Sequence, residues 1–205
     1  MASILDLLNT NVGEDFISKV SENTSENEDK ISTALGMALP FLVGAMQKNI
    51  KTNSGAESLN RALNDNKHGD VLLNNLKSVK ASEMSNEGEK ILGHILGEKQ
   101  NMITKTIGNT LNMKESSVSN ILKMAAPLLM SVLANLKSKE NVQSSGLNDL
   151  LDSVMGSSGV QNVSLIETLL DRDGDGSVID DVTGMIFGRN KKGGGGILGG
   201  MLGGK

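Results

Sequence analysis

Hydrophobic residues recur at every third or fourth position over most of the chain, which is the periodicity of amphipathic α-helices. Ile31, Leu35, Ala38, Leu42 and Met46 form one such stripe, and no segment of useful length alternates with the period of two that marks a strand. The pattern predicts an all-α protein. Long helices are expected over about 25–46 and 112–133, and shorter ones around 2–9, 13–22, 55–64, 87–96, 99–110 and 145–155.

The same pattern returns at a constant offset of 87 residues. Residues 1–46 align with 88–133 without a gap, nine positions are identical, and the only two prolines in the chain, Pro40 and Pro127, coincide. Self-similarity at one fixed offset indicates an internal duplication. We therefore expect two tandem helical repeats of about 87 residues.

Each long helix is predicted to begin with a capping box and to be disturbed by its proline. Ser25 stands three residues before Glu28, and Asn112 stands three residues before Glu115, which is the capping-box spacing. Each proline removes an amide hydrogen and clashes with the carbonyl four residues earlier. Both central helices are therefore expected to kink or break.

Composition excludes several kinds of chemistry. The chain has no Cys, two His, three Phe, no Trp and no Tyr, so thiolate zinc sites, disulfides and aromatic platforms for nucleic-acid bases are missing. The core must consist of aliphatic residues and Met. No nucleophile elbow, phosphate-binding loop, zinc-protease motif or dinucleotide fingerprint occurs. We expect a non-enzymatic protein in which His68 and His94 are structural.

Charge and hydropathy bear on location and partners. A net charge of −4 argues against broad attraction to nucleic acid or anionic lipid. The first residues lack the basic region of a signal peptide. The longest apolar stretches, 37–46 and 121–136, are shorter than the ~20 residues that span a bilayer. A cytoplasmic protein without a transmembrane segment is expected.

The acidic loop, residues 171–182, is the most specific stretch of the sequence. Its carboxylates stand at positions 1, 3 and 5 of an EF-hand-type loop, with glycine at position 6 and a backbone carbonyl at position 7. The acid expected at position 12 is replaced by Val182, so Asp181, or less favourably Asp180, must complete the site. The predicted calcium ligands are Asp171, Asp173, Asp175, the Ser177 carbonyl and Asp181.

Calcium bound there would order the loop and dock a last helix, 178–187, onto the body of the protein. Magnesium fits this loop less well, because it keeps its waters and requires octahedral geometry. The alternative is a solvated Asp-Gly turn that leads into a helix. Residues 65–76 resemble the same loop with Lys67 and Gly69 in place of two of the acids, and we expect no calcium there.

Several segments together resemble the bacterial "domain of unknown function 937" family. They are ILDLL near the start, ALPFLVGAM in the first long helix, SGAESLNRAL after it, HGDVLLNNL at 68–76 and the acidic loop followed by glycine-rich sequence. The resemblance covers about residues 1–190 and implies a bacterial, all-helical protein. It brings no established activity.

The sequence therefore predicts a non-enzymatic, calcium-binding helical protein that acts through association with a protein partner or with itself. One alternative is DNA binding through a helix-turn-helix at about 104–122. Another is contact with a membrane surface through the glycine-rich basic tail, although a flexible tail is the favoured interpretation of that composition. The expected divisions are repeat 1 at 1–86, repeat 2 at 87–165, the acidic loop with its helix at 166–188 and the tail at 189–205.

Overall fold

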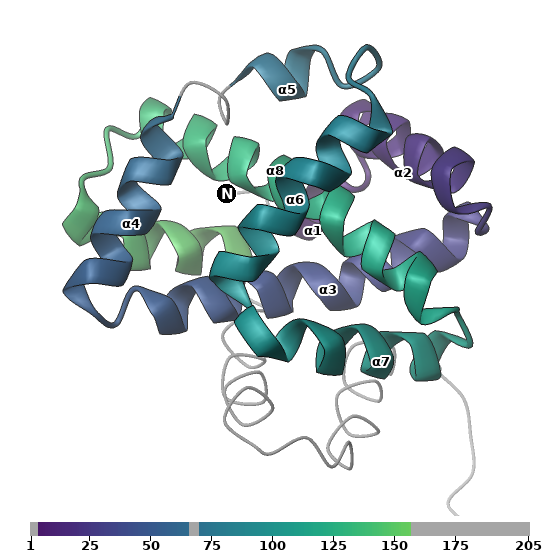
Figure 1. Ribbon diagram of the computed structural model, residues 1–205. Coiled ribbons are helices and arrows are strands. Elements are labelled where there is room, and N and C mark those ends of the chain that lie inside the picture. The colour runs from purple at the N-terminus through teal and green to yellow at the C-terminus, as the bar shows by residue number, and fades with distance from the viewer. Residues whose placement is uncertain (1–3, 66–69, 157–205) are drawn as a thin grey trace, which may run out of the picture. The chain divides into compact units, whose positions relative to one another are not determined.

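The computed structural model describes residues 4–65 and 70–156, which belong to one compact unit (Figure 1). Over these two ranges the chain forms helices and connecting turns, and no strand occurs. The prediction of an all-α fold is confirmed. The acidic loop and the glycine-rich tail lie outside the described residues.

The helices follow the order expected from the hydrophobic pattern, with two differences. A short helix occupies 70–74, where only a degenerate loop was expected, and the helix predicted at 87–96 begins six residues earlier. The helices are α1 (Ile4–Leu7), α2 (Asn11–Thr24), α3 (Glu28–Asn49), α4 (Asn53–Asn64), α5 (Asp70–Asn74), α6 (Ala81–Ile95), α7 (Gln100–Leu111), α8 (Glu115–Lys139) and a final helix over 147–156.

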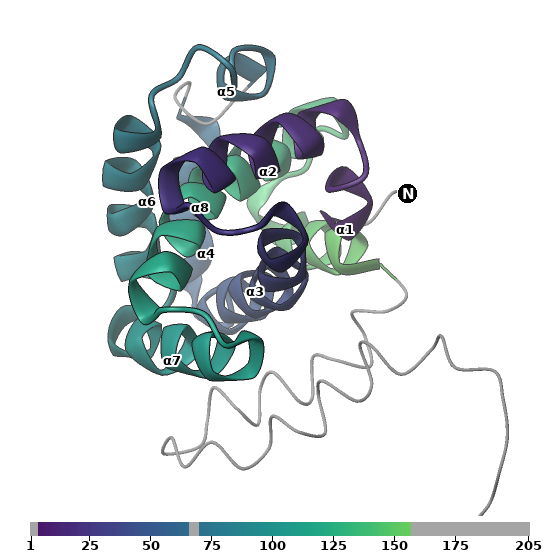
Figure 2. The ribbon, with the colours of Figure 1, turned by 90° about the vertical axis from the view of Figure 1, so that its right-hand side faces the viewer.

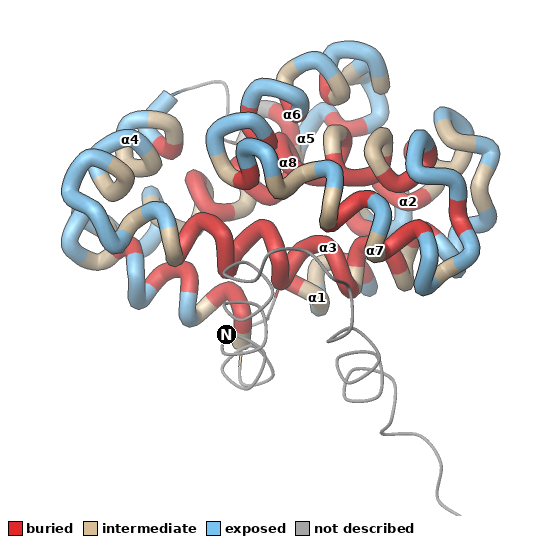
Figure 3. The backbone as a smooth tube through the Cα atoms, turned by 60° about the horizontal axis from the view of Figure 1, so that its bottom comes forward, coloured by how far each residue is buried: buried red, intermediate tan, exposed pale blue. Residues whose placement is uncertain are grey.

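The core is built around α3 and α8, which are buried on all sides. Residues 37–47 of α3 and 124–131 of α8 are buried without interruption, and Figure 3 shows the resulting buried course of α3. A helix that is apolar around its whole circumference must be enclosed by other elements. Helices α2, α6 and α7 each contact both central helices and provide much of this enclosure.

The two prolines lie inside these central helices without breaking them. Pro40 is an interior residue of α3, and Pro127 is an interior residue of α8. The sequence predicts that each proline kinks or breaks its helix, and the predicted break is therefore wrong. Each proline still lacks an amide hydrogen, so the carbonyls of Gly36 and Lys123, four residues earlier, lose their usual helical donor.

Helix α6 approaches the backbone of α8 at one of these two carbonyls. A Cβ atom at Gly88 would collide with the carbonyl group of Lys123, and the neighbouring Glu89 side chain forms an ion pair with the Lys123 amine. Helices α6 and α8 also make the most extensive helix–helix contact in the described part of the chain. The missing side chain of Gly88 therefore permits this contact.

The predicted capping boxes are wrong. Ser25 and Asn112 have left-handed backbones, with φ of 57° and 49°, and they end α2 and α7. The next helices begin three residues later, at Glu28 and Glu115: Asn27 caps α3, its side-chain oxygen accepting from the Asp29 amide at 2.8 Å, and Lys114 precedes α8 without a side-chain cap. Because these connections are so short, the residues expected to start a helix terminate the preceding one.

Several features of the described helices recur at the sequence offset of 87 residues. The left-handed residues, the starts of α3 and α8 and the two prolines all correspond at the offset of 87. Helix α2 contacts α3 and α8, and α7 contacts the same two helices; in Figure 2, α2 lies above α3 and α7 lies below it. Helices from both predicted repeats pack into one core, while the tandem duplication itself and its boundaries at 86 and 165 stay predictions.

Helix α8 is also, within the described residues, the one helix long and apolar enough to cross a membrane. However, 78% of the apolar stretch of this helix is buried inside the protein. Its hydrophobicity is therefore accounted for by its position at the centre of the helical core.

Two glycines of α6 give a matched test of the α6–α8 contact. Gly88→Ala should lower the free energy of unfolding by about 3 kcal/mol, because the new methyl group must displace backbone. Gly93→Ala, on the same helix with no atom within 4 Å of the new methyl, should leave stability unchanged or raise it by up to ~1 kcal/mol. Urea unfolding of both variants is the measurement, and equal midpoints would contradict the proposed contact.

Candidate functional site: a groove between α4 and α6

The residues predicted to bind calcium, Asp171, Asp173, Asp175, Ser177 and Asp181, all lie outside the described residues. Over 4–65 and 70–156, no group of three or more His, Asp or Glu side chains comes close enough to hold a metal ion. The calcium site stays a prediction. The described residues also form a groove flanked by α4 and α6, which is the candidate site.

Helix α4 is positioned by a tight turn that follows α3. The Thr52 hydroxyl caps α4 by accepting from the Gly55 amide at 3.1 Å, and it donates to the Asn49 carbonyl at 3.2 Å. A side chain at Gly55 would collide with that same carbonyl. At the other end of α4, the Lys137 amine donates to the Asn64 side-chain oxygen at 2.7 Å. Both ends of α4 are thus tied to the central helices.

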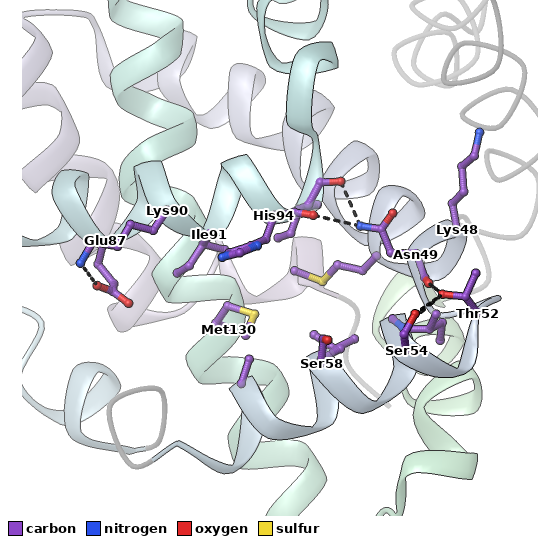
Figure 4. Close-up of a pocket in the computed structure, with 16 residues that line it drawn as sticks. Lys48, Asn49, Thr52, Ser54, Ser58, Glu87, Lys90, Ile91, His94 and Met130 are labelled. Atoms are coloured by element: carbon purple, nitrogen blue, oxygen red, sulfur yellow. Dashed lines mark hydrogen bonds and ion pairs between the residues drawn. The ribbon is translucent and has the colours of Figure 1, made fainter.

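Helix α6 is tied to α3 by one side chain. The Asn49 amide nitrogen donates to the carbonyls of His94 and Ile95, at 3.3 and 3.1 Å (Figure 4). These carbonyls belong to the last turn of α6, where helical donors run out. Asn49 thereby fixes the C-terminal end of α6 beside the C-terminal end of α3.

Between these fixed ends a groove of about 770 Å³ remains open. Its walls are α4 and α6, and its floor includes the side chains of Met46 from α3 and Met130 from α8. Leu63 is the one residue of α4 that is buried, and the half-buried Leu59 and Ala62 of the same helix line the groove. The remaining apolar and small lining residues are Ile50, Gly55, Leu59, Ala62, Ile91 and Ile95.

The charged lining residues lie toward the two ends of the groove. Lys90 and Glu87 of α6 form an ion pair of 3.3 Å at one end, and Lys48 lies at the opposite end (Figure 4). His94 is exposed on the wall between them. An apolar floor with polar groups around it is suited to hold an apolar molecule or side-chain cluster.

Sequence reasoning did not find this groove. His94 lies on a helix, as the sequence predicts, and its side chain lines the groove. The sequence contains one indication of the groove, which is the narrow apolar stripe on the otherwise polar helix α4. The stripe consists of Ala56, Leu59, Ala62 and Leu63. The helical periodicity indicates that such a stripe packs against other residues. It does not indicate how much of the stripe those residues cover.

The segment predicted as a helix-turn-helix does form two helices joined by a short turn, α7 and α8. However, two polar side chains of α8, the helix that would read DNA, are engaged within the protein. Ser117 is buried, and Lys123 is paired with Glu89. These contacts give no support to DNA binding, which stays an untested alternative.

The chain belongs to a family of bacterial proteins of unknown function, DUF937. The family model matches residues 6–136 and 144–205. This result confirms the resemblance seen in the sequence, and the match includes both the helical body and the acidic loop. Neither the curated proteins nor the solved structures gave a match.

The link between α3 and α6 can be tested with two asparagine variants. Asn49→Ala should lower the free energy of unfolding by about 1 kcal/mol, because two hydrogen bonds to helix-end carbonyls are lost. Asn86→Ala, an exposed position within α6, should have no effect or a small stabilising one. Thermal unfolding is the measurement, and a loss of the same size in both variants would show that Asn49 does not link the helices.

Proposed function

We propose that this protein is a non-enzymatic helical module that associates with another protein through the groove between α4 and α6. The observation that carries the proposal is the incompletely covered apolar side of α4, which faces a groove of about 770 Å³ floored by Met46 and Met130. The family match supplies no activity that would favour another function.

The shape and lining of the groove favour a helical segment as the bound group. Recognition of an amphipathic helix uses an apolar groove between helices, into which side chains at every third or fourth position insert. Methionine adapts to differently shaped side chains because it is unbranched and polarizable. Two methionines on the floor are therefore suited to such a role.

Calcium binding is the second part of the proposal, and it rests on the sequence of the acidic loop. Carboxylates at 171, 173 and 175 repel one another unless a cation neutralises them. The absence of a glutamate at position 12 removes the usual bidentate ligand. We therefore propose a calcium site of lower affinity than a complete EF-hand loop.

The groove can be tested with a synthetic peptide of about 16 residues that has leucine at every third or fourth position and glutamine elsewhere. The full chain is labelled with ¹³C at the methyl groups of its eleven methionines. Binding should shift the Met46 and Met130 signals, which come from the groove floor. The signals of Met37 and Met124, which are buried elsewhere in α3 and α8, should not move.

Two tryptophan variants control this experiment. Ser58→Trp places a large side chain in the groove and should weaken peptide binding by about tenfold or more, which is ~1.4 kcal/mol. Ser82→Trp places the same side chain at an exposed position of α6 outside the groove and should not affect binding. Failure of the peptide to bind wild type, or equal binding by both variants, would refute association through the groove.

Calcium binding can be tested by titration calorimetry on the full chain. Wild type should release or absorb heat at millimolar calcium or below, and Asp173→Ala should lower the affinity by about tenfold or more, because it removes a central ligand. Asp149→Ala, which removes an exposed acid outside the loop, should bind as wild type does. No heat from wild type at millimolar calcium would refute the site.

A further inference from the structure

We infer that helix α4 is a lid that undocks from the helical core as a unit, while the other described helices stay folded. Undocking removes one wall of the groove and uncovers the side chains of Met46 and Met130 on its floor. This movement needs no occupant in the groove, so it goes beyond the proposed function and does not depend on it.

Helix α4 and the final helix occupy corresponding places in the chain. Helix α4 begins at Asn53, shortly after α3, and the helical segment that continues into the final helix begins at Ser144, shortly after α8. The two helices can therefore be compared position by position at this offset of 91 residues. The identical pairs at this offset are Ser54 and Ser145, Gly55 and Gly146, and Leu59 and Leu150.

The final helix buries a complete apolar face, whereas α4 does not. The buried residues of the final helix are Leu147, Leu150, Leu151, Val154 and Met155. The residues of α4 aligned with them are Ala56, Leu59, Asn60, Leu63 and Asn64. Of these, Leu63 alone is buried. Because the burial of apolar side chains is the main force that docks a helix, α4 is held to the core much less strongly than the final helix.

Asn60 is the position at which the two helices differ most. Its aligned residue, Leu151, is 0% exposed. The side-chain oxygen of Asn60 is buried as well, and no donor from the described residues forms a hydrogen bond with it. A buried acceptor without a donor costs free energy, which water restores when the helix leaves the core. Asn60 therefore favours the undocked state of α4, whereas Leu151 favours the docked state of the final helix.

The side chains that attach the two helices also differ. The side-chain nitrogen of Gln47 in α3, a residue that is 7% exposed, donates to the Asp152 carboxylate of the final helix at 2.6 Å. The bond that joins Asn64 of α4 to Lys137 is exposed, and exposed hydrogen bonds contribute little because water offers the same partners. The bonds of Thr52 lie within the turn before α4 and its first residues, so they persist when α4 pivots about that turn. These attachments determine where α4 docks, but they do not hold it there strongly.

Amide hydrogen exchange of the full chain, measured residue by residue by NMR, tests the lid. The protection factors of α4 should be at least about a hundredfold lower than those of the final helix, because α4 opens without global unfolding. Exchange in α4 should depend weakly on urea, since undocking one helix exposes little surface, whereas exchange in α3 and α8 should depend on urea strongly. Equal protection and equal urea dependence in α4 and α3 would overturn the inference.

Variants of α4 connect its opening to Asn60. Asn60→Leu introduces the residue found at the aligned position of the final helix and should raise the protection factors of α4 by about tenfold or more. Asn60→Ala removes the same buried oxygen without adding volume, so it should also raise them by about tenfold even where a leucine does not fit. Ser58→Ala changes an exposed position of α4 and should raise them by about threefold at most, through helix propensity alone.

The outcome is independent of the peptide experiments on the groove, because no ligand is present. Protection of α4 that rises in both Asn60 variants by more than in Ser58→Ala supports the lid. Protection that stays at the wild-type level in both Asn60 variants, or that rises no further than in Ser58→Ala, would overturn it.

Discussion

The arrangement of the described residues depends on the close contact between α6 and α8 at Gly88. Pro127 deprives the Lys123 carbonyl of its helical donor, and the absence of a side chain at Gly88 allows the backbone of α6 to come against that carbonyl. The same approach brings Glu89 to the Lys123 amine. Because α6 is one wall of the groove, the position of the candidate site follows from this contact within the core.

The groove exists because α4 is attached differently from α6. Helix α6 packs along α8, whereas α4 is tied by the turn at Thr52 and by the bond between Asn64 and Lys137. Its apolar stripe is consequently only partly covered, with Leu63 alone fully buried. An apolar surface left in this condition is unfavourable in water.

Much of the fold could be predicted from the sequence, because the central helices carry long apolar runs and regular stripes. The caps could not, since Ser25 and Asn112 have the spacing of a capping box while their left-handed backbones end the preceding helices. The early start of α6 was hidden because Met84 is the one strongly apolar residue in its first two turns. The groove could not be predicted either, because its width depends on how far α4 lies from α6, which no local pattern encodes. The predicted calcium ligands, in contrast, rest on the sequence alone and lie outside the described residues.

The pairing of Asn49 with the end of α6 has a mechanical consequence for the groove. It joins the floor and one wall into a single body, since α3 provides part of the floor and α6 provides the wall. Helix α4 forms the other wall, and it is held at both of its ends, by the turn at Thr52 and by the bond between Asn64 and Lys137. The width of the groove is therefore determined by Asn49 on one side and by these two attachments on the other.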